Sequence, residues 1–139
     1  MKIARSLVVL LATILAASGA LAARGGAPIQ NYQDLPVASG SGKPLTAEQV
    51  KNAIISGGAR ARWSASIQPG NVIRLTYSPR SHSAVVDVAY TAKAYSIRYA
   101  NSVNLGYSPD GGTGTIHPNY NKWVANLRQA IEVALRSQD

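Results

Sequence analysis

The chain has 139 residues, with 14 Lys and Arg against six Asp and Glu, and it contains no cysteine. This length leaves room for one domain with a modest core. The absence of cysteine excludes disulfides, thiolate metal sites and a cysteine nucleophile. The net charge of +8 favours anionic partners such as phosphate-rich surfaces, nucleic acid or acidic glycans, but it does not choose among them.

The first 22 residues have the features of a secretory signal peptide. Lys2 and Arg5 precede an apolar run over residues 7–17, and small residues follow as far as Ala22. This order predicts cleavage after Ala22. The apolar run is shorter than the roughly 20 residues that a membrane-spanning helix needs. We therefore expect a mature protein without an integral membrane span, located in the periplasm or secreted.

Residues 23–45 are rich in glycine and proline, which predicts a flexible leader whose Ile29, Tyr32 and Leu35 dock only locally. A single α+β domain is expected over residues 46–139.

The domain begins with a strong helix-start signal. Thr46 is the expected N-cap, and Gln49 stands three residues later, where it completes a capping box. The helix is expected to end at the glycine pair of residues 57–58, because glycine adopts the left-handed conformation that terminates helices.

Apolar and polar residues alternate from Trp63 to Ala100, which is typical of an antiparallel meander. Keeping large side chains on one face sets the register, since a slip of one residue would reverse a strand's faces. This rule places Ile67 opposite Ile73, and Val88 between Ile73 and Ile97. The sequence therefore predicts four strands in chain order.

The final segment reads as a long helix, with His117 as N-cap and Pro118 at the first helical position. An apolar stripe is formed by residues spaced three and four apart, which are Tyr120, Val124, Leu127, Ile131 and Ala134.

Together these elements predict a two-layer α+β sandwich in the order α-β-β-β-β-α, with both helices on one face of the sheet. The residues expected on that face are Trp63, Ile73, Leu75, Val86, Val88, Ile97 and Tyr99.

The same register makes a prediction for the other face. Arg74 lies opposite Asp87, and Asp87 lies opposite Arg98, so one carboxylate stands between two guanidinium groups. One interpretation is surface electrostatics on a solvated face. The other is an anion-binding site in which Arg74 and Arg98 hold a carboxylate or phosphate and Asp87 fixes their geometry.

Signals for catalysis are sparse. His82, His117 and Asp110 are candidates for a metal site or a base and nucleophile set, but they lack the spacing of a zinc motif. The glycine-rich stretch 108–115 lacks the Lys-Ser/Thr of a phosphate-binding loop. We therefore expect no metal, no cofactor and no catalytic residues.

Several tyrosines are interleaved with arginines, as in some nucleic-acid platforms. Tyr77, Tyr90, Tyr95 and Tyr99 alternate in phase with the apolar residues, however, so we expect them in the core. No nucleic-acid partner is predicted.

Three runs carry a resemblance to known proteins: RSHSAVVDVAY (80–90), YSIRYANSVNL (95–105) and IHPNYNKWVANL (116–127). They resemble small exported proteins and lipoproteins of Gram-negative proteobacteria. The resemblance implies an envelope location and one compact domain, and it supplies no activity or site residues. This chain differs from the lipoprotein members because no cysteine follows its apolar run.

The function expected from the sequence is that of a non-enzymatic exported binding or interaction domain, with an unknown protein or an anionic envelope component as partner. The alternative is a small hydrolase or metal-dependent enzyme that uses His82, His117 and Asp110.

Overall fold

The structure, a computed structural model, describes residues 26–138. The predicted signal peptide, the first residues of the predicted leader and Asp139 lie outside this range. The elements in chain order are β1 (Ala27–Pro28), β2 (Tyr32–Pro36), α1 (Ala47–Arg60), β3 (Ser64–Gln68), β4 (Val72–Tyr77), β5 (Ser83–Tyr90), β6 (Ala94–Val103), β7 (Thr115–Ile116) and α2 (Pro118–Arg136).

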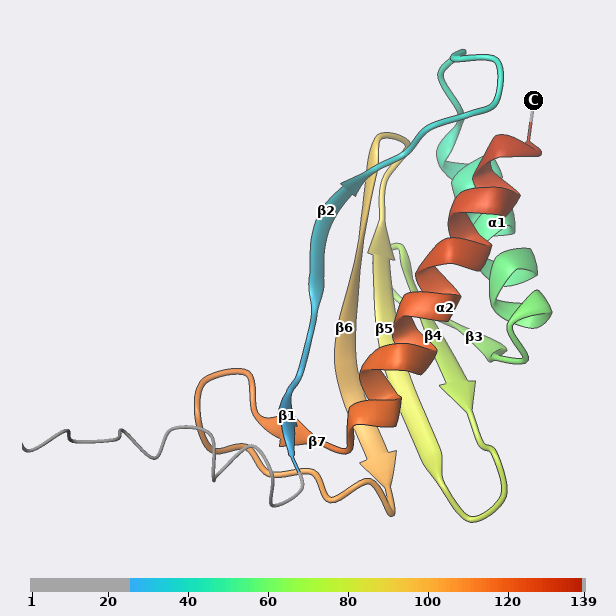
Figure 1. Cartoon of the computed structure of the whole chain (residues 1–139). Coiled ribbons are helices and arrows are strands. Elements are labelled where there is room, and N and C mark those ends of the chain that lie inside the picture. Colours follow the sequence, from blue (N-terminus) through green and yellow to red (C-terminus); the bar gives the residue numbers. More distant parts are fainter. Residues whose placement is uncertain (1–25, 139) are drawn as a thin grey trace, which may run out of the picture.

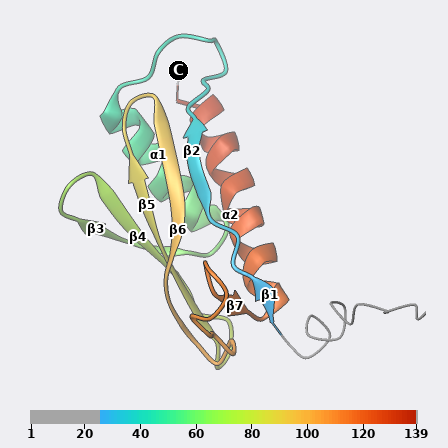
Figure 2. The ribbon, with the colours of Figure 1, turned by 90° about the vertical axis from the view of Figure 1, so that its left-hand side faces the viewer.

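The fold is α+β, with a five-stranded antiparallel sheet in the order β2-β6-β5-β4-β3 and two helices on one of its faces (Figure 1). The view in Figure 2 looks onto the other face, with the helices behind the sheet. The short strands β1 and β7 form a separate antiparallel pair. Within residues 26–138, no helix combines the length and the apolar character needed to cross a membrane.

The prediction of a four-stranded sheet is wrong by one strand. The four predicted strands are present as β3 to β6, but β2 joins the sheet beside β6 and comes from the segment that was expected to be a flexible leader. Residues 26–45 are therefore part of the domain rather than a leader.

Side-chain hydrogen bonds to the backbone hold this first segment in place. Asn121 of α2 accepts from the Gln30 amide at 3.0 Å, and it donates to the Pro28 carbonyl at 2.9 Å. Asn31 in turn accepts from the amide of Tyr99 on β6 at 2.9 Å. Ile29 is buried with the core. The segment is ordered because these bonds and this burial together offset its loss of chain entropy.

The start of α1 follows the prediction. Thr46 accepts a hydrogen bond from the Gln49 amide at 3.1 Å, and the Gln49 side chain accepts from the Thr46 amide at 2.9 Å. This is the expected capping box.

The predicted end of α1 is wrong, because the helix continues through Gly57 and Gly58 to Arg60. Both glycines are buried where the helix meets its neighbours. A Cβ added at Gly57 would lie 2.8 Å from the Ile131 Cα of α2. Glycine at this position thus allows the two helix backbones to approach closely, and it does not terminate the helix.

The predicted register is confirmed for the central pairs of the meander, although the register between β5 and β6 shifts between Val85 and Val86. Ile67 pairs with Ile73, Ile73 with Val88, and Val88 with Ile97. Asn71 adopts the expected left-handed conformation in the β3–β4 turn, with φ of 55°.

The helix-covered face carries the predicted apolar residues. Six of the seven are buried, namely Trp63, Ile73, Leu75, Val86, Val88 and Ile97. The seventh, Tyr99, is partly buried and packs edge-on against the Tyr120 ring of α2. Ile67 is in phase with the residues on the helix-covered face, but it is 62% exposed.

Helix α2 begins as predicted, with the Nδ1 of His117 accepting from the Asn119 amide at 3.1 Å. Every residue of its predicted apolar stripe is buried against the sheet or α1.

Candidate functional site

A row of polar side chains crosses the open face of the sheet, with one residue from each strand. Ser66 pairs with Arg74, Arg74 with Asp87, and Asp87 with Arg98. The Arg98 guanidinium then donates to the side chain of Gln33 on β2. We call this row of five residues the polar ladder.

The centre of the polar ladder is an ion pair between β4 and β5. The Arg74 Nε lies 2.9 Å from Asp87 Oδ1, and the Arg74 Nη2 lies 3.0 Å from Asp87 Oδ2. The hydrogen bonds and charge of Asp87 raise the pKa of Arg74. Both carboxylate oxygens of Asp87 thus already have a guanidinium partner, and the geometry is the two-pronged one that arginine forms with carboxylates.

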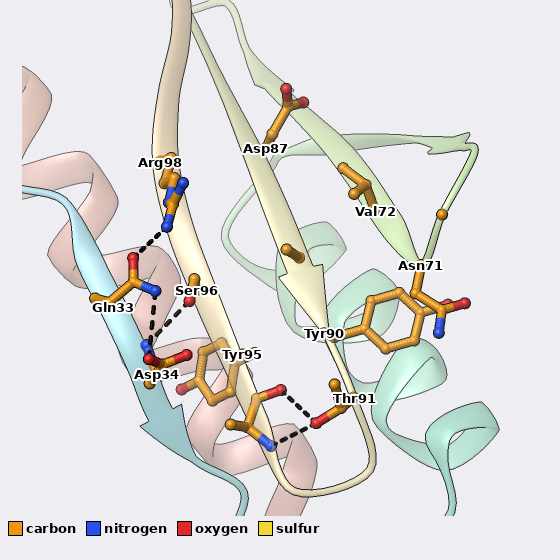
Figure 3. A pocket seen from close by; sticks show the side chains of 13 residues that line it. Gln33, Asp34, Asn71, Val72, Asp87, Tyr90, Thr91, Tyr95, Ser96 and Arg98 are labelled. Carbon is orange, nitrogen blue, oxygen red and sulfur yellow. Dashed lines mark hydrogen bonds between the residues drawn. The ribbon is translucent and has the colours of Figure 1, made fainter.

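Arg98 has a different partner. Its Nη2 donates to the amide oxygen of Gln33, and the Gln33 Nε2 donates to Asp34 Oδ2 at 3.3 Å (Figure 3). In Figure 3 the side chains of Arg98 and Asp87 point in different directions. Among residues 26–138, no carboxylate forms an ion pair with Arg98.

An irregularity in β2 brings Gln33 and Asp34 to this position. The register with β6 shifts between Tyr32 and Leu35, and Asp34 has a left-handed φ of 52°. These are the properties of a β-bulge, which re-aims side chains at the edge of a sheet. The amide of Asp34 bonds to the Ser96 hydroxyl at 2.9 Å. Ser96, although polar, is 7% exposed.

The open face is hollowed beside Arg98. The hollow has a volume of about 540 Å³. It is lined by residues of β2, the β3–β4 turn, β4, β5, β6 and the β5–β6 turn, which are Gln33, Asp34, Gly70, Asn71, Val72, Asp87, Ala89, Tyr90, Thr91, Ala94, Tyr95, Ser96 and Arg98. Of the three predicted site residues, Asp87 and Arg98 line it and Arg74 stands beside it.

Sequence reasoning placed Arg74, Asp87 and Arg98 in one row, and the strand pairing has this order. Asp87 bonds to Arg74 but not to Arg98, which bonds to Gln33 instead. Sequence reasoning missed Gln33, Asp34 and Ser96. The order of Tyr32, two polar residues and Leu35 could have indicated a bulged edge strand. The glycines and prolines on either side favoured the prediction of a flexible segment instead.

The candidate catalytic residues have structural partners of their own. The Nδ1 of His82 lies 2.8 Å from the Asn104 carbonyl oxygen, so this nitrogen is the donor. His117 caps α2. Asp110 bonds within its own loop, where its Oδ2 accepts from the Ser108 hydroxyl at 3.2 Å.

None of His82, His117 and Asp110 lines the hollow on the open face. Within residues 26–138, no group of three or more His, Cys, Asp or Glu residues is placed to hold a metal ion.

Comparison of the chain with protein-family models, curated proteins and solved structures finds no match.

Proposed function

We propose that the protein is a non-enzymatic binding domain of the cell envelope that holds a small anionic group against Arg98 in the hollow of the open sheet face. The observation that carries this proposal is the difference in pairing between two neighbouring arginines. Asp87 neutralises Arg74 through two hydrogen bonds, whereas Arg98, within residues 26–138, bonds only to the neutral side-chain amide of Gln33. The charge of Arg98 therefore remains available to a ligand.

The surroundings of Arg98 supply a second polar contact. The Ser96 hydroxyl accepts from the Asp34 amide, so its own proton is free to be donated. Ser96 and Arg98 lie two residues apart on β6, and side chains with this spacing share a face of a strand. A carboxylate or phosphate placed between them gains a guanidinium and a hydroxyl donor together.

The two carboxylates in the hollow limit which anions fit. The Asp87 carboxylate is paired with Arg74. In the described part of the chain, the Asp34 carboxylate accepts only the side-chain amide of Gln33, at 3.3 Å. A second negative charge on the ligand would meet Asp34. We therefore favour a ligand with a single anionic group and a neutral or cationic remainder, and an apolar part would contact Val72 and Ala89.

The envelope location belongs to the same proposal. It is supported by the order of charged, apolar and small residues in the first 22 positions, and by the resemblance to exported proteobacterial proteins.

The test is a titration with acetate and with inorganic phosphate, followed by NMR shifts of the Ser96 and Arg98 amides. With acetate, wild-type protein should show saturable shifts at both residues, and Arg98→Gln should lose them. Phosphate should bind more weakly at neutral pH, because its second charge would meet Asp34. Lys122→Gln, on an exposed position of α2, is the matched control because it removes the same unit of charge elsewhere. Equal loss in both variants would mean that net charge alone attracts the anion, and it would contradict the proposal.

A third variant uses the ion pair itself. Asp87→Asn releases Arg74 beside Arg98 and so adds a second uncompensated guanidinium to the face. Anion affinity should rise in this variant, and an unchanged or lower affinity would count against the site.

A further inference from the structure

The two edges of the sheet differ in how they are protected from pairing with another strand. Edge strand β2 contains a bulge, the charged Asp34 and Pro36, and each of these discourages the addition of a further strand. Edge strand β3 reads SASIQ, with no charge, no proline and an unbroken five-residue register with β4. The β3 edge therefore lacks these three protections.

The β3 edge is also accessible. Figure 2 shows the β3–β4 hairpin extending beyond the two helices, with no helix or strand of residues 26–138 along its outer side. Ser64, Ala65 and Ser66 are exposed, and Ile67 is 62% exposed on the side of the sheet that the helices cover elsewhere. Every second residue of an edge strand points its backbone N–H and C=O outward, so this edge offers unpaired hydrogen-bonding groups beside an uncovered apolar side chain.

We propose that β3 pairs antiparallel with β3 of a second copy of this chain, around a twofold axis that passes through Ser66. In this register Ala65 of one copy lies opposite Ile67 of the other, and Ser64 lies opposite Gln68. Apolar residues thus meet apolar residues on the helix side, and polar residues meet polar residues on the open side. A strand that matches its own reversed copy in this way suits an isologous interface.

Charge also favours contact between two copies through the β3 edge over contact through other parts of the surface. A chain of net charge +8 repels itself over most of its surface. Residues 63–73 carry no charged side chain. In the proposed register Arg62 would face Gly70 of the other copy, so no like charges are opposed.

The dimer would join the two sheets into one, with their helices on the same side. Each polar ladder ends at Ser66, so the two ladders would meet at the twofold axis. The hollow beside Arg98 is lined mostly by residues of β2, β5 and β6, but Gly70 and Asn71 of the β3–β4 turn also line it. Because Gly70 faces Arg62 of the second copy in the proposed register, the interface would reach the rim of each hollow. The dimer is argued from β3 and the anion site from Arg98, so either proposal can fail without the other.

Single-cysteine variants test this register, because the chain has no cysteine of its own. Directly opposite residues of an antiparallel pair have Cα atoms about 4.5–5.5 Å apart, which suits a disulfide. Ser66→Cys should therefore cross-link rapidly to itself under mild oxidation. In Ser64→Cys the two thiols would be offset by four residues along the strand, roughly 13 Å, and should not cross-link. Both positions are exposed, so each variant keeps the fold, which circular dichroism verifies.

Sedimentation equilibrium of the wild-type protein completes the test. We expect the average molar mass to rise from that of a monomer to that of a dimer as the protein concentration increases. Ile67→Lys, which places a charge in the apolar part of the interface, should remain a monomer at the same concentrations. Val133→Lys, at an exposed position of α2 (37% exposed), should behave like wild type. A wild-type monomer at every concentration, or equal cross-linking of Ser64→Cys and Ser66→Cys, would overturn the proposal. Pairing of β3 with a foreign peptide while the chain stays monomeric would overturn it as well.

Discussion

The two faces of the sheet are built from the same strands, yet one is apolar and buried while the other is polar and exposed. Along β4, Leu75 points into the core and is fully buried, while its neighbour Arg74 is exposed on the open face and paired with Asp87. The covered face derives its stability from close packing with α1 and α2. The open face contributes hydrogen bonds, charge and a hollow. Substitutions on the two faces should accordingly separate stability from binding.

The largest effect is expected on the covered face. Leu75→Ala removes a fully buried side chain and leaves a cavity beneath α1, which costs about 2–5 kcal/mol of unfolding free energy. Arg74→Ala, one residue away on the open face, should leave the urea midpoint close to that of wild type. Similar midpoint losses in both variants would show that the two faces are not separable.

A smaller loss of stability is expected from Gly57→Ala. Alanine is the better helix former by about 1 kcal/mol, so a simple helix position would be stabilised. At Gly57 the added Cβ would lie 2.8 Å from the Ile131 Cα and 2.9 Å from the Ala130 carbonyl oxygen. Forcing the helices apart costs about 1–3 kcal/mol, so the net change should be a lower unfolding free energy.

The matched control for Gly57→Ala is Asn52→Ala, at an exposed position of the same helix, which should be neutral or slightly stabilising. Stabilisation in both variants would contradict the close helix approach.

These contacts also show how far the sequence could be read. The strand registers followed from alternation, because a slip of one residue would have placed Ile73 and Val88 on opposite faces of the sheet. The capping box at Thr46 was predictable because its hydrogen bonds join residues three apart. Both signals are local or periodic, and the sequence displays them directly.

The remaining features depend on contacts between distant residues. Gly57 reads as a helix stop until α2 is placed against it. Strand β2 depends on bonds from Asn121, Ser96 and the Asn31 side chain, and single polar residues at these positions show no periodicity. The alternation placed Arg98 on the open face, but its partner Gln33 followed only once β2 was in the sheet. The row of charged residues in the candidate site was therefore predictable from the sequence. The hollow beside Arg98 was not.

A smaller effect is expected from a buried hydroxyl group on the covered face. The Tyr95 hydroxyl is buried without a hydrogen-bond partner among residues 26–138. A buried polar group left unpaired costs about 1–3 kcal/mol, so Tyr95→Phe should equal or exceed the wild-type stability at pH 7. A clear loss of stability in this variant would mean that the hydroxyl has a partner after all.

Alkaline pH tests the same hydroxyl. Burial, together with the nearby charge of Glu132, raises the pKa of Tyr95 from 10.0 to about 12. Above pH 10 the unfolded chain therefore loses this proton while the folded chain retains it, and stability falls as the pH rises from about 10 to 12. Tyr95→Phe should show a shallower fall in a series of urea melts. Some slope should remain, because burial also raises the pKa of Tyr120.

The smallest effect is expected from the ion pair at the centre of the polar ladder. The side chains of Arg74 and Asp87 are 46% and 33% exposed, and exposed pairs of this kind contribute little because water and salt screen them. The double variant Arg74→Gln with Asp87→Asn conserves net charge and size. Its thermal midpoint should match wild type in low salt and in 1 M salt. A wild-type midpoint that falls with salt while that of the variant stays constant would show that the pair stabilises the fold, and that the open face supports the sheet in addition to carrying the proposed anion site.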